Sequence, residues 1–308
     1  MIRLTAKYAR LCALLSAAGV LALAAPGAKA EWALNMTPGI TALSREIYSL
    51  HMLMFWWCVG IAIVVFGVMI YSMVHFRKSA GAVADVHLTH STRVEVIWTI
   101  VPVLILISMA VPAAKTLVQT EDATGSQLTI RVTGYQWKWG YEYVGTGVTV
   151  LSTLGRRSDE ARQLQSGIDP FTVPNYLLEV DHPLVVPAGV KVRLLITGQD
   201  VIHSWWMPAF AIKKDAIPGF INEAWFQTDP DKIGTYRGQC AELCGRDHGF
   251  MPIVVEVRSK ADFEDWLRTQ KQAQQQQSEP APGQQLPAPQ GTAPAPTAGN
   301  TPSGVPAA

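Results

Sequence analysis

The sequence predicts a transmembrane hairpin of two helices followed by an all-β Greek-key sandwich. Two apolar runs, residues 52–74 and 96–118, are each long enough to cross a bilayer. Several short alternating segments, separated by glycine and proline, follow them between residues 119 and 268. The composition agrees, because only 16% of the residues are charged while 49% are hydrophobic. That balance is poor in charge for a soluble protein and favours membrane segments.

Residues 1–30 have the pattern of a cleaved secretory signal peptide. A basic start with three Arg or Lys side chains precedes an apolar stretch at residues 11–25, and Ala28-Lys29-Ala30 fits a small-x-small cleavage site. The alternative is a further transmembrane helix. The shortness of the apolar run and the Pro26-Gly27 pair favour the signal peptide over that helix.

The charge balance indicates that nucleic acid is not a partner. The whole chain has a formal net charge of +1. Removal of residues 1–30 takes away four basic side chains and no acidic one, which leaves 21 of the 25 basic groups against 24 acidic groups. Nucleic-acid-binding proteins usually carry a basic surface, so we expect no such binding.

The two apolar runs predict a hairpin within residues 31–118. Each run has 23 residues, and a helix of that length extends about 34 Å at 1.5 Å per residue, enough for the hydrocarbon core of a bilayer. The loop between them carries three Arg or Lys side chains against Asp85 and Glu95. Short basic loops stay in the cytoplasm. We therefore expect everything after residue 118 on the opposite side of the lipid bilayer.

Residues 119–268 are expected to form the sandwich. Alternating segments predict strands at residues 128–135, 137–143, 176–180, 190–197, 234–239 and 252–257. Residues 145–174 lack periodicity, and we interpret them as a surface excursion. Ser259 and Asp262 resemble a capping box and predict a short helix. Residues 269–308 are dominated by Gln, Pro and Ala, a composition that predicts a disordered tail.

The stretch from Cys240 to Met251 brings together side chains that bind soft metals. It contains Cys244 and His248 as well, and His203 lies upstream at the end of an expected strand. Two cysteines four apart could form a disulfide, and two Cys with two His could hold zinc. Thiolate, imidazole and thioether together are typical of copper, and zinc has no use for the methionine. Since a mononuclear site needs only one cysteine, the two thiolates could bridge two coppers, each with one histidine.

These residues resemble the CuA domain of the cytochrome c oxidase subunit II family. The resemblance extends from about residue 50 to residue 267 and includes the helical hairpin. It implies a cupredoxin-like fold for the sandwich. The segments that carry it are Cys240-x-x-x-Cys244-x-x-x-His248-x-x-Met251, Asp200-Val201-Ile202-His203-Ser204-Trp205, Asp215-Ala216-Ile217-Pro218-Gly219, residues 134–143 and residues 94–99.

The resemblance implies a complete set of metal ligands. A dinuclear copper centre would be held by the backbone carbonyl of Glu242 and by the side chains of His203, Cys240, Cys244, His248 and Met251. In the family the Glu242 carboxylate also binds magnesium at the boundary with subunit I, a role that suits a hard oxygen ligand. No Cys-x-x-Cys-His motif occurs, so we expect no haem on this chain.

The resemblance also implies a role in respiration. Single electrons would pass from cytochrome c, by way of Trp137, to the copper centre and on to haem a in subunit I. There O2 would be reduced to water and protons pumped. Glu95 would stand at the mouth of a proton path. An equal alternative is that Glu95 only stabilises the N-terminus of its helix, where the helix dipole favours a negative charge. The complex would lie in the bacterial inner membrane, as a multi-pass assembly with the copper domain in the periplasm.

A cationic donor fits the charge of the predicted sandwich. Residues 119–268 contain 15 basic and 19 acidic side chains, and an acidic surface steers a basic cytochrome toward it. Family-like docking positions are occupied by Glu142, Asp181 and Asp200.

Two other functions share parts of this pattern. A quinol-oxidase-type subunit has the same hairpin and sandwich but lacks the copper ligands, which are all present here. A copper carrier or assembly protein would show clusters of Met or His, and the sequence contains none of these clusters.

Overall fold

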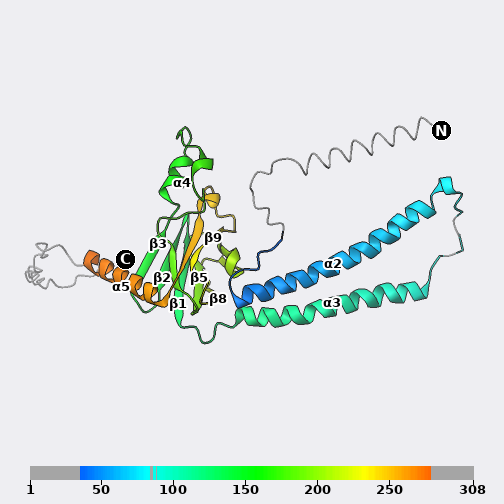
Figure 1. Ribbon diagram of the computed structural model, residues 1–308, viewed down its shortest axis with the longest axis horizontal. Coiled ribbons are helices and arrows are strands. Elements are labelled where there is room, and N and C mark those ends of the chain that lie inside the picture. Colours follow the sequence, from blue (N-terminus) through cyan, green and yellow to red (C-terminus); the bar gives the residue numbers. More distant parts are fainter. Residues whose placement is uncertain (1–34, 84–85, 88, 279–308) are drawn as a thin grey trace, which may run out of the picture.

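The computed structural model describes residues 35–83, 86–87 and 89–278. The expected signal peptide and residues 279–308 of the expected tail lie outside the described residues. Two long helices run from a β-sandwich, and a smaller helical segment, α4, extends from one end of the sandwich (Figure 1).

The two long helices are α2, Ala42–His75, and α3, Thr92–Glu121. Both exceed the apolar runs because their polar ends continue the helix toward the sandwich and the loop. α2 begins with a capping box, in which Thr41 Oγ1 accepts from Ser44 N at 2.9 Å and Ser44 Oγ accepts from Thr41 N at 3.0 Å. Each helix is long and apolar enough to cross a membrane. The short turn η1, Lys78–Ala80, follows α2.

Ten strands form two five-stranded sheets, as the sequence predicts in outline. The first sheet has the order β3-β2-β1-β5-β8 and the second β4-β10-β9-β6-β7. β1 pairs antiparallel with β2 and parallel with β5, and β10 pairs antiparallel with β9 and parallel with β4. The strands are Leu128–Tyr135, Lys138–Tyr143, Val148–Ser152, Leu184–Pro187, Lys191–Gly198, His203–Met207, Ile212–Ala216, Asn222–Gln227, Gly234–Cys240 and Pro252–Arg258, for β1 to β10 in order.

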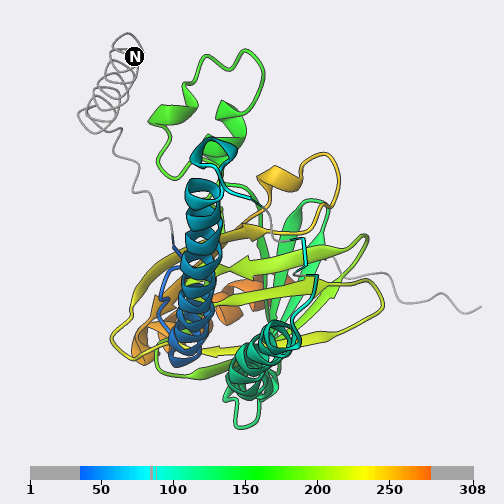
Figure 2. The ribbon, with the colours of Figure 1, turned by 90° about the vertical axis from the view of Figure 1, so that its right-hand side faces the viewer.

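The core lies between the two sheets and is built by strand alternation. In β2 every second residue is buried, so that Trp139, Tyr141 and Tyr143 all face inward. β5 alternates in the same way and buries Leu194 and Ile196. In Figure 2 the two long helices lie in front of the strands of the sandwich and extend toward the viewer.

Some expected strands differ from the structure. Residues 176–178 form a turn and a bend rather than a strand, since Asn175 and Leu177 adopt left-handed φ values of 50° and 62°. Val180 forms only an isolated bridge with Leu154. β4 was not predicted because it is buried on both faces, so that apolar and polar residues do not alternate along it. β7 was not predicted because it carries Lys213, Lys214 and Asp215.

The expected excursion at residues 145–174 contains regular structure. Its first part is β3, the edge strand of the first sheet. The remainder holds α4, Arg156–Ala161, and the turn η2, Pro170–Thr172. Two further turns, η3 at Pro208–Phe210 and η4 at His248–Phe250, lie in the loops of the second sheet.

The C-terminal helix α5, Lys260–Ser278, is longer than expected. Its start agrees with the prediction, because Ser259 Oγ accepts from Asp262 N at 3.1 Å. The expectation of disorder from residue 269 is wrong for residues 269–278, which are helical. Gln274 explains part of the extension: its amide pairs with the backbone N and O of Thr149, at 3.1 and 2.7 Å, along the edge of β3. Glutamine is also a good helix former.

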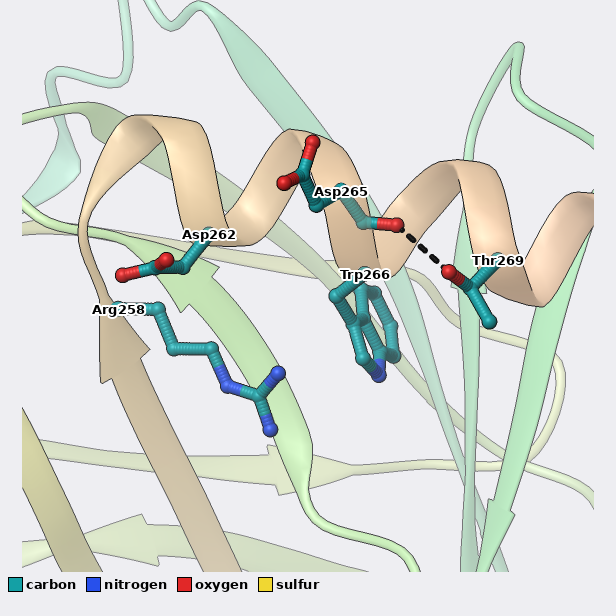
Figure 3. Close-up of a pocket in the computed structure, with 5 residues that line it drawn as sticks. All are labelled: Arg258, Asp262, Asp265, Trp266 and Thr269. Atoms are coloured by element: carbon teal, nitrogen blue, oxygen red, sulfur yellow. Dashed lines mark hydrogen bonds between the residues drawn. The ribbon is translucent and has the colours of Figure 1, made fainter.

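α5 borders an open surface hollow of about 510 Å³ (Figure 3). The helix lies on the side of the sandwich away from the hairpin (Figure 1). Arg258 on β10 and the helical residues Asp262, Asp265, Trp266 and Thr269 line it. Trp266 packs toward Tyr143, with ring centres 5.2 Å apart, so the apolar side of the helix closes this end of the core.

The hairpin is joined to the sandwich by polar contacts at both helix ends. Near the start of α2, Arg45 donates two hydrogen bonds to Asp229, at 2.7 and 3.2 Å. At the end of α3, Lys191 Nζ donates to the backbone carbonyls of Asp122 and Thr124, at 2.8 and 2.9 Å, and lies 4.0 Å from the ring centre of Trp225. These contacts fix the sandwich on top of the hairpin.

Candidate metal centre

The candidate site lies where three segments meet at one end of the second sheet. His203 begins β6, Cys240 ends β9, and Met251 precedes β10. Two backbone hydrogen bonds hold these segments together: Cys240 N donates to Met251 O and Ala241 N to Ser204 O, both at 3.0 Å. The loop between Cys240 and Met251, here called the copper loop, is therefore anchored at both ends.

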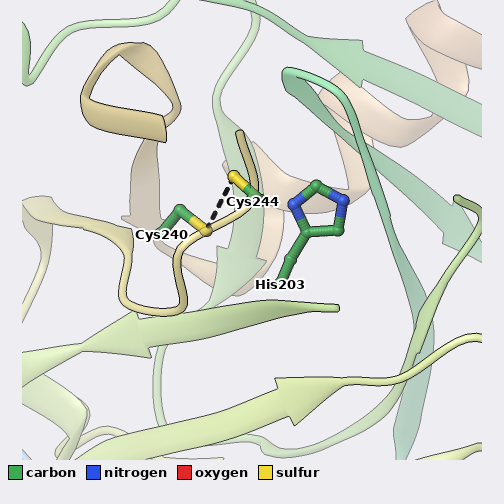
Figure 4. Close-up of side chains that lie close together, drawn as sticks. All are labelled: His203, Cys240 and Cys244. Atoms are coloured by element: carbon green, nitrogen blue, oxygen red, sulfur yellow. Dashed lines mark hydrogen bonds between the residues drawn. The ribbon is translucent and has the colours of Figure 1, made fainter. Parts of the chain in front are cut away.

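The structure brings His203, Cys240 and Cys244 into one buried cluster. Their ligand atoms all lie within 4.8 Å of one another, and the imidazole ring faces both thiols (Figure 4). The two sulfur atoms are 3.8 Å apart and both cysteines are free. A disulfide bond is about 2.05 Å long, so the alternative of a small disulfide is not what the structure contains. Soft sulfur with imidazole is a donor set that suits copper.

His203 is oriented so that one nitrogen faces the thiols. Its Nε2 lies 2.8 Å from the Asp200 carboxylate, and its buried Nδ1 has no hydrogen-bond partner among the described residues. A metal-binding histidine commonly has this arrangement, in which a carboxylate fixes the tautomer and leaves the other nitrogen available. Gly134 makes room for the ring, because a Cβ at that position would lie 2.7 Å from His203 Cδ2.

The electrostatics of the cluster favour a thiolate at one cysteine. Burial raises the pKa of the Cys240 thiol, but the adjacent His203 imidazole and the nearby backbone of Ser204 and Glu242 lower it by more, so that the pKa falls below the ordinary value. Burial and the neighbouring charge of Cys240 raise the pKa of Cys244. For His203 burial lowers the pKa, while Cys240 and Asp200 raise it by more. The His203 imidazole and the Cys240 thiol therefore stabilise each other's charged forms.

The remaining expected ligands surround this cluster. His248 Nδ1 lies 3.5 Å from Cys244 Sγ, and the backbone carbonyl of Glu242 lies 3.4 Å from Cys240 Sγ. Met251 is buried, whereas the Glu242 side chain is exposed. The structure thus brings all the expected copper-site residues to the same end of the sandwich.

Trp137 contacts the copper loop directly. Its Nε1 donates a hydrogen bond of 3.0 Å to the backbone carbonyl of Cys244, and Gln136 Nε2 donates one of 2.9 Å to the same oxygen. The guanidinium of Arg246 lies 5.7 Å from the Trp137 ring centre. Sequence reasoning missed Gln136, although its position next to Trp137 in the family-like segment could have suggested it.

The carboxylate of Asp200, one of the expected docking residues, lies beside His203. Besides His203, it accepts hydrogen bonds from Gln136 N and Val201 N, both at 2.7 Å. Burial raises its pKa, but these three hydrogen bonds lower it by more. The three-residue spacing from Asp200 to His203 could have indicated this contact.

The other expected residues lie apart from the cluster. Glu142 forms an ion pair with Arg131 across β1 and β2. Asp181 accepts hydrogen bonds from Thr153 N and Oγ1, at 2.7 and 2.8 Å. Glu95 lies in the first turn of α3, near the end of the hairpin that points away from the sandwich.

Comparisons with known proteins identify the family. Residues 128–258 match the family described as cytochrome c oxidase subunit II, periplasmic domain, and residues 29–116 match its transmembrane domain. A probable cytochrome c oxidase subunit 2 of Rickettsia bellii is 35% identical, over 77% of this chain and 83% of that protein. The protein of the same description from Rickettsia prowazekii is 39% identical, over 77% of this chain and 72% of that protein.

A solved structure agrees in sequence. The crystal structure of the periplasmic domain of subunit II of cytochrome oxidase from Bradyrhizobium japonicum is 38% identical, covers 49% of this chain and 99% of that one, and has a TM-score of 0.42. The two apolar helices and the cupredoxin-like sandwich with a cluster able to bind copper agree with the matched family domains. The chain belongs to the cytochrome c oxidase subunit II family and is a membrane subunit of an oxidase complex.

Proposed function

We propose that this chain is the subunit at which electrons enter a proton-pumping cytochrome c oxidase, accepting them singly from cytochrome c at a dinuclear copper centre. The observation that carries the proposal is the buried cluster of two free thiols and an imidazole whose Nδ1 has no partner. A buried nitrogen without a hydrogen bond is costly unless a ligand uses it. Membership of the family supports the same function.

The proposed ligands divide between two coppers. The side chains of Cys240, Cys244, His203, His248 and Met251, with the Glu242 carbonyl, would hold them. When bound, the copper centre would supply a one-electron acceptor. The chain's own residues hold this acceptor in place: Asp200 fixes the His203 ring, and backbone hydrogen bonds fix both ends of the copper loop. A preorganised site of this kind costs little reorganisation.

Trp137 is the proposed point where electrons enter from cytochrome c. The hydrogen bond from its Nε1 to the Cys244 carbonyl supports this role, because it joins the ring directly to the backbone of a proposed ligand. The ring is partly buried against the core, with one side beside the copper loop. Electrons would leave toward haem a in subunit I, where O2 is reduced to water.

The acidic surface of the sandwich would guide the donor. Glu142 and Asp181 remain proposed docking residues, although each also has a partner in this chain. We propose a role for Asp200 mainly through His203, since its carboxylate oxygens accept three hydrogen bonds. Screening by salt should weaken this steering.

Further roles concern the membrane and its boundary. The exposed Glu242 carboxylate is proposed to bind magnesium where the chain meets subunit I, and Glu95 to stand at the mouth of a proton path. The proposed topology places the sandwich in the periplasm of a bacterial inner membrane after cleavage of residues 1–30. The two membrane-length helices and the periplasmic-domain match support that arrangement.

The two alternatives fit the site less well. A quinol-oxidase-type subunit has no use for this set of sulfur and imidazole ligands. A copper carrier needs a site from which metal can be exchanged, whereas Cys240 and Cys244 are only 3% and 2% exposed.

The proposal is tested on the purified oxidase complex. Reduced cytochrome c is mixed with the oxidised complex in a stopped-flow instrument. The near-infrared band of the copper centre should bleach before haem a is reduced. Complex depleted of this copper should lose fast haem reduction and regain it when copper is restored. Haem reduction at an unchanged rate without the copper would contradict the proposed function.

A further inference from the structure

One side chain of the segment around α4, that of Arg162, contacts the copper loop. Arg162 directly follows α4, and its Nε donates a hydrogen bond of 2.7 Å to Asp159 Oδ1. Its guanidinium carbon lies 4.5 Å from the ring centre of Phe250, and Nη1 lies 3.6 Å from Asp247 Oδ1. Phe250 and Asp247 belong to the copper loop. A residue from the segment 145–174 thus contacts the loop that carries several of the proposed metal ligands.

The backbone that carries Arg162 is fixed to the sandwich. Ser158 and Ala161 are buried, and Ser158 Oγ accepts a hydrogen bond of 3.1 Å from Leu177 N. Gly155 N, at the start of α4, donates to Glu179 O at 2.8 Å. Arg162 N continues the helical ladder by donating to Ser158 O at 3.0 Å. The guanidinium is therefore presented from a defined position.

The turn that Arg162 contacts has few side-chain contacts within the copper loop, where Asp247 pairs at 3.4 Å with Arg246, a side chain that is 83% exposed. The turn η4 is a single turn of 3-10 helix, without a side-chain cap, that carries His248 as its first residue. Its backbone hydrogen bonds run from His248 N to Gly245 O, at 3.2 Å, and from Phe250 N to Asp247 O, at 2.9 Å. Arg162 contacts the residue before His248 and the residue two positions after it.

We propose that Arg162 is a positioning residue that holds the His248 turn, and with it the adjoining Met251, in register with the two thiols. This inference rests on the proposed function, because it assigns Arg162 a role toward the proposed copper ligands. The ion pair holds Asp247, and the cation–π contact holds Phe250. Cation–π contacts and partly buried ion pairs each stabilise such arrangements modestly, and together they restrict the turn.

A second arginine, Arg156, forms an ion pair that lies away from the copper loop and is much more exposed. Arg156 pairs with Glu160 at 3.5 Å one turn apart on α4, and the two side chains are 88% and 50% exposed. Arg162 and Asp247 are only 25% and 14% exposed. Exposed pairs contribute little. Arg156 is therefore a matched control in the same helix, with the same charge and no contact with the copper loop.

The test uses the complete oxidase complex with Arg162→Ala, Arg162→Lys or the control Arg156→Ala in this chain. Copper content, the electron paramagnetic resonance hyperfine pattern and the rate of copper release to a chelator are measured. Arg162→Ala should load copper, shift the hyperfine coupling and release the metal about tenfold faster, since loss of a residue that orients a ligand commonly costs a metal site this much. Arg162→Lys should fall between, and Arg156→Ala should match the wild type.

The outcomes separate this inference from the proposed function. If the wild-type complex carries no dinuclear copper on this chain, the proposed function fails. If it does, and Arg162→Ala matches Arg156→Ala in hyperfine pattern and release rate, the positioning role of Arg162 is refuted while the function stands. Should Arg162→Ala fail to assemble, Arg162→Lys decides, because a wild-type spectrum and release rate in that variant would equally refute the role.

Discussion

The sandwich and the hairpin differ in how far each buries its apolar side chains. The sandwich buries its own, and Ile130, Leu194 and Ile253 are completely enclosed. Of the hairpin helices only Leu43, Ser44 and Thr116 are buried, and all three lie near the sandwich. The rest of the hairpin presents apolar side chains outward, as suits lipid or neighbouring subunits. The site geometry therefore depends on the sandwich, and the hairpin supplies its attachment.

The largest expected effect comes from removing one thiol. Cys240→Ser should abolish the delocalised dinuclear site, because a hydroxyl does not replace a bridging thiolate. The matched control in the hairpin is Cys58→Ser, at an exposed position on α2. The electron paramagnetic resonance spectrum and the copper content of both variants are compared. A full wild-type spectrum in Cys240→Ser would show that this thiol does not bridge, and loss of the site in Cys58→Ser would break the contrast between the regions.

Two glycines, one in the sandwich and one in the hairpin, allow a second comparison of the two regions. Gly134→Ala should destabilise the protein by about 1–3 kcal/mol through overpacking, because the new Cβ would lie 2.7 Å from His203 Cδ2. It should also weaken copper binding by displacing the ring. Gly60→Ala in α2 meets nothing within 4 Å and should cost nothing. Thermal unfolding with and without copper measures both. Equal stability in the two variants would mean that the ring has more room than the structure gives it.

Trp137→Phe tests where electrons enter. The variant removes the hydrogen bond to the Cys244 carbonyl. It should slow cytochrome c oxidation by about tenfold, equivalent to about 1.4 kcal/mol of activation free energy. Copper content should stay unchanged. The control is Trp56→Phe on the exposed face of α2, with a wild-type rate expected. Stopped-flow rates at low ionic strength decide, and an unchanged rate in Trp137→Phe would move the point of electron transfer elsewhere.

The smallest effect is expected at the edge of the sandwich. Gln274→Ala removes two hydrogen bonds to Thr149 on β3, and should lower the free energy of unfolding by about 1 kcal/mol. Gln272→Ala, on the same helix without a contact of this kind to β3, serves as the control. Urea unfolding measures both variants. If the two are equally stable, the extension of α5 does not depend on this contact.

Local patterns account for the parts of the fold and site that could be predicted. β1 and β5 alternate clearly, and the spacing from Cys240 to Met251 lies within one loop. Features that depend on distant contacts could not be predicted. β4 is buried on both faces, and residues 269–278 are helical partly because Gln274 meets Thr149. The contact of Arg162 with Phe250 joins residues without any local pattern between them.

The most direct test of the central claim is the copper stoichiometry of the full chain, taken together with its electron paramagnetic resonance spectrum. We predict two coppers and one unpaired electron coupled equally to both nuclei, because both thiols and His203 Nδ1 lie in one buried cluster. A single copper with the spectrum of a mononuclear site would contradict the bridging role of the two cysteines. A chain that holds zinc, or no metal at all, would contradict the proposed function.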